Sequence, residues 1–312
     1  MANSALWSGA HLSWPDLSGW IRAALAEVDR RKAAGEPVSD RPALVSIAVC
    51  RWIIAHFLGE DWFVRNAMPD GRVNSFLLPV FDGAEGTAPV YTMRIFNLAE
   101  CLFHLQYIQN SAWPIRSLAA EAQMESAIAE LQIGSLLFQQ AIPFRYLEPN
   151  TAPGVRTPDI ELWVGNRTAL ADVKCKYEIR DYEPGCLKSA FQDAREQIGS
   201  GNEGFVFVKV PQKWGWYTGE ELMLRKQAVD EARKHMRGTS RIVKTIFYTF
   251  NMEQLPTGLR IRNAILEANK PNIAADSIWN QPISAFDRPA GWLTIPDLIE
   301  RAQLGDAYFQ RR

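Results

Sequence analysis

Cysteine is scarce in this chain of 312 residues, and the spacing of the few cysteines excludes several classes of site. Cys50, Cys101, Cys175 and Cys186 form neither a zinc-knuckle pattern nor a CxxC pair, so no structural zinc site or dithiol redox motif is predicted. A chain of this length can bury a sufficient core without disulfides. We therefore expect reduced thiols and a cytoplasmic location.

Long apolar runs are also few. The first residues lack the basic segment followed by an apolar one that marks a signal peptide. The most apolar stretch, residues 43–58, contains Arg51 and His56 and is shorter than the ~20 residues that a membrane span requires. It is interpreted as a buried helix, and no membrane partner is predicted.

Several familiar catalytic motifs are absent from the sequence. Neither a phosphate-binding GxxxxGK[ST] loop nor a GxSxG nucleophile elbow occurs. Residues 199–204 spell GxGxxG, but they follow a helical pattern and precede a strand, the reverse of a dinucleotide site. This glycine-rich segment is interpreted as a loop.

Neither sign of charge dominates, since the net charge is −1, yet the charges are unevenly distributed. Asp and Glu outnumber Lys and Arg over residues 111–200, and the reverse holds over residues 201–262. This order suits a site that binds a cation, followed by a surface that contacts a phosphate backbone. Ordinary solvated helix faces would produce the same pattern.

The apolar periodicity divides the chain into three regions. Residues 1–114 read as mainly helical, with helices near 17–34, 42–58 and 94–108 and a loop over 68–89. Residues 115–250 alternate between helices (117–140, 187–198, 219–236) and strands (144–147, 159–164, 168–175, 204–210, 242–250). Residues 251–312 are rich in proline and predict an irregular extension that packs on the core. The order of elements predicts an α/β fold with a mixed sheet flanked by helices.

The most informative segment runs from Thr157 to Lys174. Gly165-Asn166 between two apolar runs predicts a two-residue hairpin turn. With that turn, Asp159 and Asp172 face each other across the ladder, with Cβ atoms ~5 Å apart. Lys174 projects to the same side, because side chains alternate along a strand.

Two like charges opposite each other destabilise a hairpin, so this pair calls for a compensating cation. Oxygen-only ligation suits Mg²⁺ or Mn²⁺. Such an ion would lower the pKa of a bound water, and Lys174 would assist that water. The alternative is a surface hairpin with scattered charges. The apolar residues that alternate along both strands indicate instead that the hairpin is largely buried.

Pro158-Asp159 followed by Asp172-Val173-Lys174 resembles the signature of the PD-(D/E)xK nuclease superfamily. The order of helix, three strands, helix and strand over residues 117–210 resembles its restriction-endonuclease-like core as well. The resemblance implies a metal-dependent nuclease in which Glu130, Asp159, Asp172 and the Val173 carbonyl hold the metal. Glu125 is the second choice for the helix glutamate. The resemblance also makes Gln197, on the helix after the third strand, a residue that positions water or phosphate.

The expected substrate is nucleic acid, with DNA favoured over RNA, and the expected setting is restriction, repair or phage defence. The best candidates for contacts to a nucleic-acid backbone are basic side chains after the hairpin: Lys176, Lys209, Lys213, Arg225, Lys226, Arg233 and Lys234. Trp214, Trp216 and Tyr217 either stack on bases or form a packed aromatic corner. Residues 1–114 would select substrate or a protein partner, including a second copy of the chain.

Two other functions fit the same residues. One is a non-catalytic nucleic-acid-binding module on this scaffold, although a pure binder has no use for a costly carboxylate pair. The other is a metal-dependent hydrolase of a smaller phosphate ester. Metal-dependent binding of long nucleic acid, compared with mononucleotides, separates them.

Overall fold

The computed structural model of the chain divides into two compact units. One comprises Met1–Ser135 with Gly291–Arg312, and the other comprises Leu136–Ala290. This division differs from the expected one at residue 114, because α5 and most of α6 belong to the helical unit. The structure describes residues 10–38, 41–67, 77, 87–120, 123–150, 152, 156–176, 182–183, 185–211, 214, 222–255, 258–274, 276–280, 282 and 292–305.

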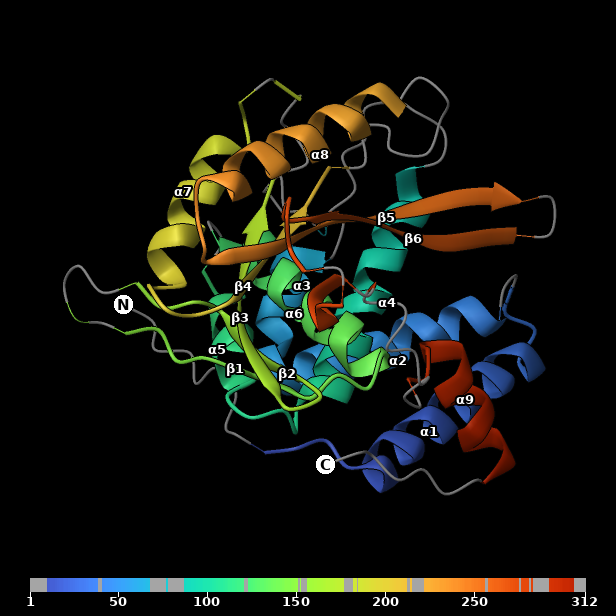
Figure 1. The fold of residues 1–312 in the computed structure, drawn as a ribbon. Coiled ribbons are helices and arrows are strands. Elements are labelled where there is room, and N and C mark those ends of the chain that lie inside the picture. Colours follow the sequence, from blue (N-terminus) through green and yellow to red (C-terminus); the bar gives the residue numbers. More distant parts are fainter. Residues whose placement is uncertain are drawn as a thin grey trace. The chain divides into compact units, whose positions relative to one another are not determined.

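The described residues form an α/β protein with a six-stranded mixed sheet and nine α-helices (Figure 1). The helices of the first unit are α1 (Trp14–Ala33), α2 (Arg41–Leu58), α3 (Glu60–Ala67), α4 (Thr87–Leu105), α5 (Ala112–Ser117) and α9 (Ile295–Leu304), together with most of α6 (Met124–Gln139). The helices predicted at 17–34, 42–58 and 94–108 appear as α1, α2 and α4, whereas α3 was not predicted. Most of the loop predicted at 68–89 lies outside the described residues.

Helix α1 illustrates how local chemistry defines these elements. The Ser13 hydroxyl accepts a hydrogen bond from the Asp16 amide at 3.2 Å, and a proline occupies the first turn. The buried positions include Leu17, Ile21 and Leu25, which recur at helical spacing. The apolar stripe seen in the sequence is therefore the face that packs against α2.

Helix α2 has the length and composition of a membrane span, with a mean hydropathy of 1.4 over 18 residues. Core helices of soluble proteins share these properties. Val49, Ile53 and Phe57 are fully buried, and α2 packs against α1, α3, α4 and α9. Packing inside its own unit agrees with the predicted buried helix.

The last part of the chain is attached to the first unit by a buried carboxylate on α4. Glu100 accepts hydrogen bonds from the Ile295 amide at 2.8 Å and from the Trp292 indole N–H at 3.3 Å. Burial raises the pKa of Glu100 to about 7. These contacts anchor the start of α9 on α4, so residues 292–305 are not a loose tail.

The sheet of the second unit has its strands in chain order: β1 (Phe144–Tyr146), β2 (Ile160–Val164), β3 (Arg167–Cys175), β4 (Gly204–Lys209), β5 (Ile242–Leu255) and β6 (Gly258–Asn269). β1, β2 and β3 run antiparallel to one another in turn. β3, β4 and β5 are parallel, and β6 returns antiparallel to β5. The two parallel connections contain α7 (Lys188–Gln197) and α8 (Leu222–Arg237), as β-α-β units require.

The predicted hairpin between β2 and β3 is confirmed in position and register. Val164 pairs with Arg167, and the ladder continues to Ile160 opposite Ala171. Gly165 takes a φ of 60°, the positive value that the first central residue of a type II′ turn requires. The register that aligns Asp159 with Asp172 follows from this turn.

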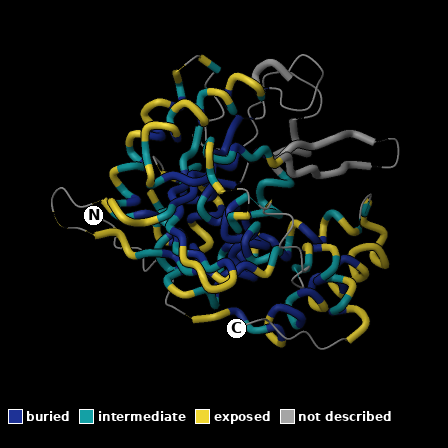
Figure 2. Tube along the Cα trace, in the orientation of Figure 1, coloured by how far each residue is buried: buried dark blue, intermediate teal, exposed yellow. Residues whose placement is uncertain are grey.

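Both α7 and α8 pack on the same face of the sheet. Their apolar residues, including Phe191 and Ala232, form one buried cluster with Val206 and Val208 of β4. Every residue of β4 is buried, and buried positions follow the central strands in Figure 2. Asp172 pairs with Val206 and therefore lies on this covered face.

The irregular extension predicted for residues 251–312 is wrong in the described part. β5 continues to Leu255, β6 occupies Gly258–Asn269, and α9 follows after residue 294. The prolines that suggested a loop flank these elements and do not interrupt them. Pro271 comes just after β6, and Pro296 stands in the first turn of α9 beside the Thr294 cap.

Gly204 offers a test of the packing of α7 on β4. A Cβ at this position would lie 2.5 Å and 2.6 Å from side-chain carbons of the buried Ile198. We expect Gly204→Ala to lower the free energy of unfolding by ~1–3 kcal/mol, because overpacking displaces the helix end. Urea denaturation measures the change. Gly238→Ala is the control, since its Cβ would meet nothing nearer than 3.9 Å. Equal effects at both positions would contradict the packing argument.

Candidate functional site

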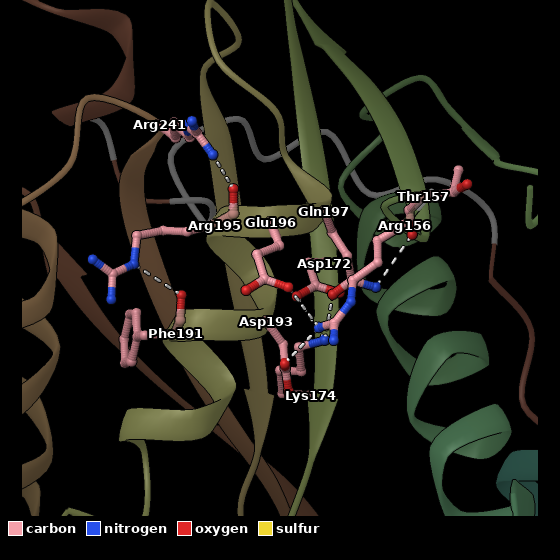
Figure 3. Close-up of polar contacts among 10 residues, drawn as sticks. All are labelled: Arg156, Thr157, Asp172, Lys174, Phe191, Asp193, Arg195, Glu196, Gln197 and Arg241. Atoms are coloured by element: carbon pink, nitrogen blue, oxygen red, sulfur yellow. Dashed lines mark hydrogen bonds and ion pairs between the residues drawn. The ribbon is translucent and has the colours of Figure 1, made fainter. Parts of the chain in front are cut away.

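Asp172 and Lys174 of the predicted hairpin come together with Gln197 of α7 on the covered face of the sheet (Figure 3). The carboxyl group of Asp159 contacts that of Asp172. Asp172 and Lys174 project from β3, Asp159 lies in the bend before β2, and Gln197 is the last residue of α7. The alternation of β3 places Asp172 and Lys174 on one side. The parallel crossover brings the end of α7 above them.

Asp159 is held by the backbone of the neighbouring strands. Its amide donates to the Ala171 carbonyl at 3.0 Å, and its carbonyl accepts from the Leu147 amide at 2.9 Å. Its carboxylate Oδ2 accepts from the Val173 amide at 2.6 Å. Hydrogen bonds to an ionised carboxylate are the stronger kind, so the position of Asp159 is well determined.

Asp172 is a fully buried carboxylate, with 0% of the side chain exposed. Lys174 Nζ lies 2.8 Å from Oδ2, at an angle that forms an ion pair without a well-directed hydrogen bond. Burial raises the pKa of Asp172, and the Lys174 charge and the contact with the Asp159 carboxyl offset this only in part. The site therefore holds a carboxylate that is short of cationic partners.

Lys174 supplies part of the positive charge beside the hairpin carboxylates that was predicted to come from a metal ion. Besides Asp172, its Nζ donates to Gln197 Oε1 at 2.6 Å. The Gln197 amide in turn donates to the Thr157 carbonyl at 3.2 Å. This chain of contacts connects β3, α7 and the segment before β2, and it fixes the lysine head group beside the carboxylates.

A second group of charged side chains lies beside Asp172 and Lys174. The Arg156 Nη1 atom lies 2.7 Å from Asp193 Oδ1 and 3.1 Å from Glu196 Oε2, both on α7. Figure 3 shows the three side chains grouped beside Asp172 and Lys174. The sequence did not predict this group of charges. The i, i+3 and i, i+4 spacing of Asp193, Glu196 and Gln197 on α7 was the signal that could have revealed its carboxylates, whereas nothing in the sequence singled out Arg156.

Two carboxylates of the site are available as ligands for a divalent cation. Within the described ranges, no group of three or more His, Cys, Asp or Glu side chains is arranged as a metal site. Asp159 and Asp172 would therefore share a cation with water molecules. Mg²⁺ accepts such an arrangement, since it keeps several waters and is commonly bound through one or two carboxylates. The buried, under-compensated charge of Asp172 fits this role.

The further ligands expected for a metal stay predictions. Glu130 and Glu125 are partly buried on α6, in the portion that belongs to the helical unit. The Val173 amide is bound to Asp159, while its carbonyl is the group assigned to the metal. Neither assignment is tested by these contacts.

The basic residues expected to contact nucleic acid fall into four groups. Lys226, Arg233 and Lys234 are exposed on α8, and Arg225 is partly buried there. Lys176 is partly buried and donates to the Cys186 carbonyl at 2.6 Å. The expectation for Lys209 is corrected, because only 3% of this residue is exposed and a backbone phosphate cannot reach it. Lys213 lies outside the described residues.

The structure describes one of the three aromatic residues after β4. Trp214 is buried and packs edge-on against Tyr182, with ring centroids 5.2 Å apart. This geometry agrees with a packed aromatic corner and leaves little ring surface for a base. Trp216 and Tyr217 lie outside the described residues.

Two polar cavities border α7. One of about 680 Å³ is lined by Gln192, Asp193, Arg195, Glu196 and residues 238–241. The other, of about 430 Å³, is lined by Lys176, Glu183, Gly185, Cys186, Lys188, Ser189, Gln192 and Trp214. Gln192 lines both cavities, so this position of α7 is accessible to solvent or a ligand.

Because burial of the Asp172 charge is costly, a substitution that removes this charge should raise the stability of the folded protein. A raised carboxyl pKa in the folded state means that stability is lost as the pH rises above the ordinary value of 3.8. We expect Asp172→Asn to unfold at higher urea concentration than the wild type at pH 7 without divalent metal. The difference should shrink toward pH 4.

Asp230→Asn, at an exposed position of α8, is the control and should lack this gain. A lower stability of Asp172→Asn at pH 7 would instead mean that attraction to Lys174 outweighs the burial of the carboxylate.

The site combines an acidic pair, a fixed ammonium group and a polar side chain that orients it, which is a suitable set for binding a cation beside a phosphate. The side chains that carry this chemistry come from β3, from α7 and from the segment before β2. No protein-family model, curated protein or solved structure matches the chain.

Proposed function

We propose that this protein is a metal-dependent nuclease that hydrolyses phosphodiester bonds, in DNA in preference to RNA. The observation that carries the proposal is the fully buried, under-compensated carboxylate of Asp172, which lies beside Asp159 and Lys174. Burying a charge without sufficient partners is costly. A site that regularly binds a divalent cation removes that cost.

In this proposal, Asp159 and Asp172 would hold Mg²⁺ or Mn²⁺, with the Val173 carbonyl as the further expected ligand within the same unit. When bound, the ion supplies Lewis-acid polarisation of the phosphate and a water of lowered pKa. Lys174 would orient the attacking water through the N–H groups of its ammonium. The 2.6 Å contact to Gln197 keeps that ammonium group in place.

The order of elements supports the same proposal. α6, β1, β2, β3, α7 and β4 follow one another as helix, three strands, helix and strand. That order and the Asp159, Asp172 and Lys174 signature underlie the resemblance to the PD-(D/E)xK superfamily. A restriction-endonuclease-like fold is part of the proposal on these grounds.

A polymeric substrate is favoured over a small phosphate ester by the surface of α8. Lys226 and Arg233 are exposed and seven residues apart, so they lie on one side of the helix. A row of cations suits a phosphate backbone better than a single phosphate group. Nucleic acid is therefore the proposed partner.

Cleavage assays test the proposal directly. Plasmid, linear duplex DNA, single-stranded DNA and RNA are incubated with Mg²⁺, with Mn²⁺ or with a chelator. We expect cleavage only with metal, and Asp172→Ala and Lys174→Ala to reduce its rate at least ~100-fold, because each removes a group that acts on the water or its ion. Asp276→Ala, at an exposed position outside the site and outside α8, serves as the matched acidic control, and circular dichroism verifies folding.

The outcomes separate the rival functions. Binding of nucleic acid without cleavage under any condition would favour a non-catalytic binding module. Hydrolysis of mononucleotides with intact polymers would favour a hydrolase of smaller phosphate esters. Absence of both binding and hydrolysis would refute the nuclease proposal.

The α8 surface makes a separate prediction about salt. We expect Lys226→Ala and Arg233→Ala each to reduce the slope of log K against log salt concentration by about 0.9, the value for one lost phosphate contact on duplex DNA. Fluorescence anisotropy with a labelled duplex measures the slope. Arg167→Ala, at an exposed ion pair with Glu203, is the control. Unchanged slopes in both α8 variants would remove this helix from the interface.

A further inference from the structure

Arg156 occupies a distinctive place beside the site. The segment that carries it is well anchored, because the Thr157 carbonyl accepts from Gln197 and the Thr157 hydroxyl accepts from the Asn150 amide at 2.9 Å. The next residue, Pro158, is buried. The Arg156 side chain itself is 50% exposed, so a fixed backbone presents a half-exposed cation beside the carboxylates.

The contacts of Arg156 leave much of its guanidinium available. Both described ion pairs, to Asp193 and Glu196, use the single atom Nη1. Within the described part of the chain, Nε and Nη2 of Arg156 donate no hydrogen bond to a carboxylate, since its one such bond is from Nη1 to Asp193. These two nitrogens form one of the edges by which a guanidinium binds a phosphate through two parallel hydrogen bonds.

The partners of Arg156 hold it only weakly. The Asp193 and Glu196 side chains are 47% and 61% exposed, and ion pairs between exposed groups contribute little to stability. The hydrogen bond with Asp193 is the main reason why the pKa of Arg156 is raised, and the Asp172 carboxylate adds a smaller contribution. Replacing these two carboxylates by a phosphate as the partner of Arg156 therefore costs little stability.

The overall charge of the site explains why such a cation is needed. Asp159, Asp172, Asp193 and Glu196 outnumber Lys174 and Arg156 by two. A phosphate approaching this surface is repelled unless positive charge faces it. Lys174 is only 19% exposed and is engaged with Asp172 and Gln197. Arg156 is thus the more accessible of the two cations.

We propose that Arg156 binds the phosphate group of the substrate, and that the Arg156 side chain pairs with Asp193 and Glu196 when no substrate is present. This inference rests on the proposed nuclease function and assigns a substrate-contacting residue to the same site. On binding, the guanidinium leaves the two carboxylates of α7 and pairs with the non-bridging phosphate oxygens. No bond other than hydrogen bonds changes in this step.

The test compares four variants on the best DNA substrate of the wild type, with the optimal divalent metal. Arg156→Ala should lower kcat by ~10- to 100-fold, the effect of losing hydrogen bonds to a charged group. Arg156→Lys keeps the charge without the two-pronged geometry and should recover part of this loss. The Asp193→Asn/Glu196→Gln double variant should stay within about fivefold of wild type, since exposed pairs contribute little. Arg167→Ala is the control and should match the wild type.

The outcomes distinguish the two levels of the argument. If the wild type and Arg167→Ala cleave DNA but Arg156→Ala cleaves equally well, the inference is overturned and the nuclease proposal survives. If the double variant loses as much activity as Arg156→Ala, the arginine serves only a structural ion pair, and the inference is again overturned. If the wild type cleaves nothing, both proposals fail together.

Discussion

Burial of the Asp172 carboxylate is the constraint on which the arrangement of the site depends. The strand β3 brings this charge under α7, where none of its surface meets water. An isolated charge there would be strongly destabilising, so its neighbours must respond. Lys174 forms an ion pair with Asp172 and donates a hydrogen bond to Gln197. The Gln197 amide in turn donates to the Thr157 carbonyl. The stability of this part of the second unit and its proposed chemistry therefore depend on the same few atoms.

Helix α7 has two functions in this arrangement. Its apolar side packs Phe191 and Ala194 into the core with β4. Its polar side carries Gln197 over Lys174, and Asp193 and Glu196 over Arg156. Packing of the apolar side sets the height and rotation of the polar side. A substitution that disturbs the contact between Ile198 and Gly204 should therefore shift Lys174, because Ile198 follows directly after Gln197 at the end of α7.

Much of the second unit could be predicted, because its signals are local. Gly165-Asn166 defines the turn, and a two-residue turn leaves one register for β2 and β3. The alternation of side chains then groups Asp159, Asp172 and Lys174. The strand β6 was missed because its flanking prolines were read as loop signals. The burial of Lys209 was missed because it depends on which sheet face is covered, which no local pattern states.

The sequence by itself determined the hairpin, its register and the side of the sheet on which the carboxylates and lysine lie. Turn chemistry and the two-residue period of a strand act over a few neighbouring residues, so they can be read directly. Only the tertiary structure decided that Gln197 reaches Lys174, and that Arg156 meets Asp193 and Glu196 across 37 and 40 residues of chain. Those contacts follow from the way α7 packs on the sheet, and packing is a property of all the core side chains together.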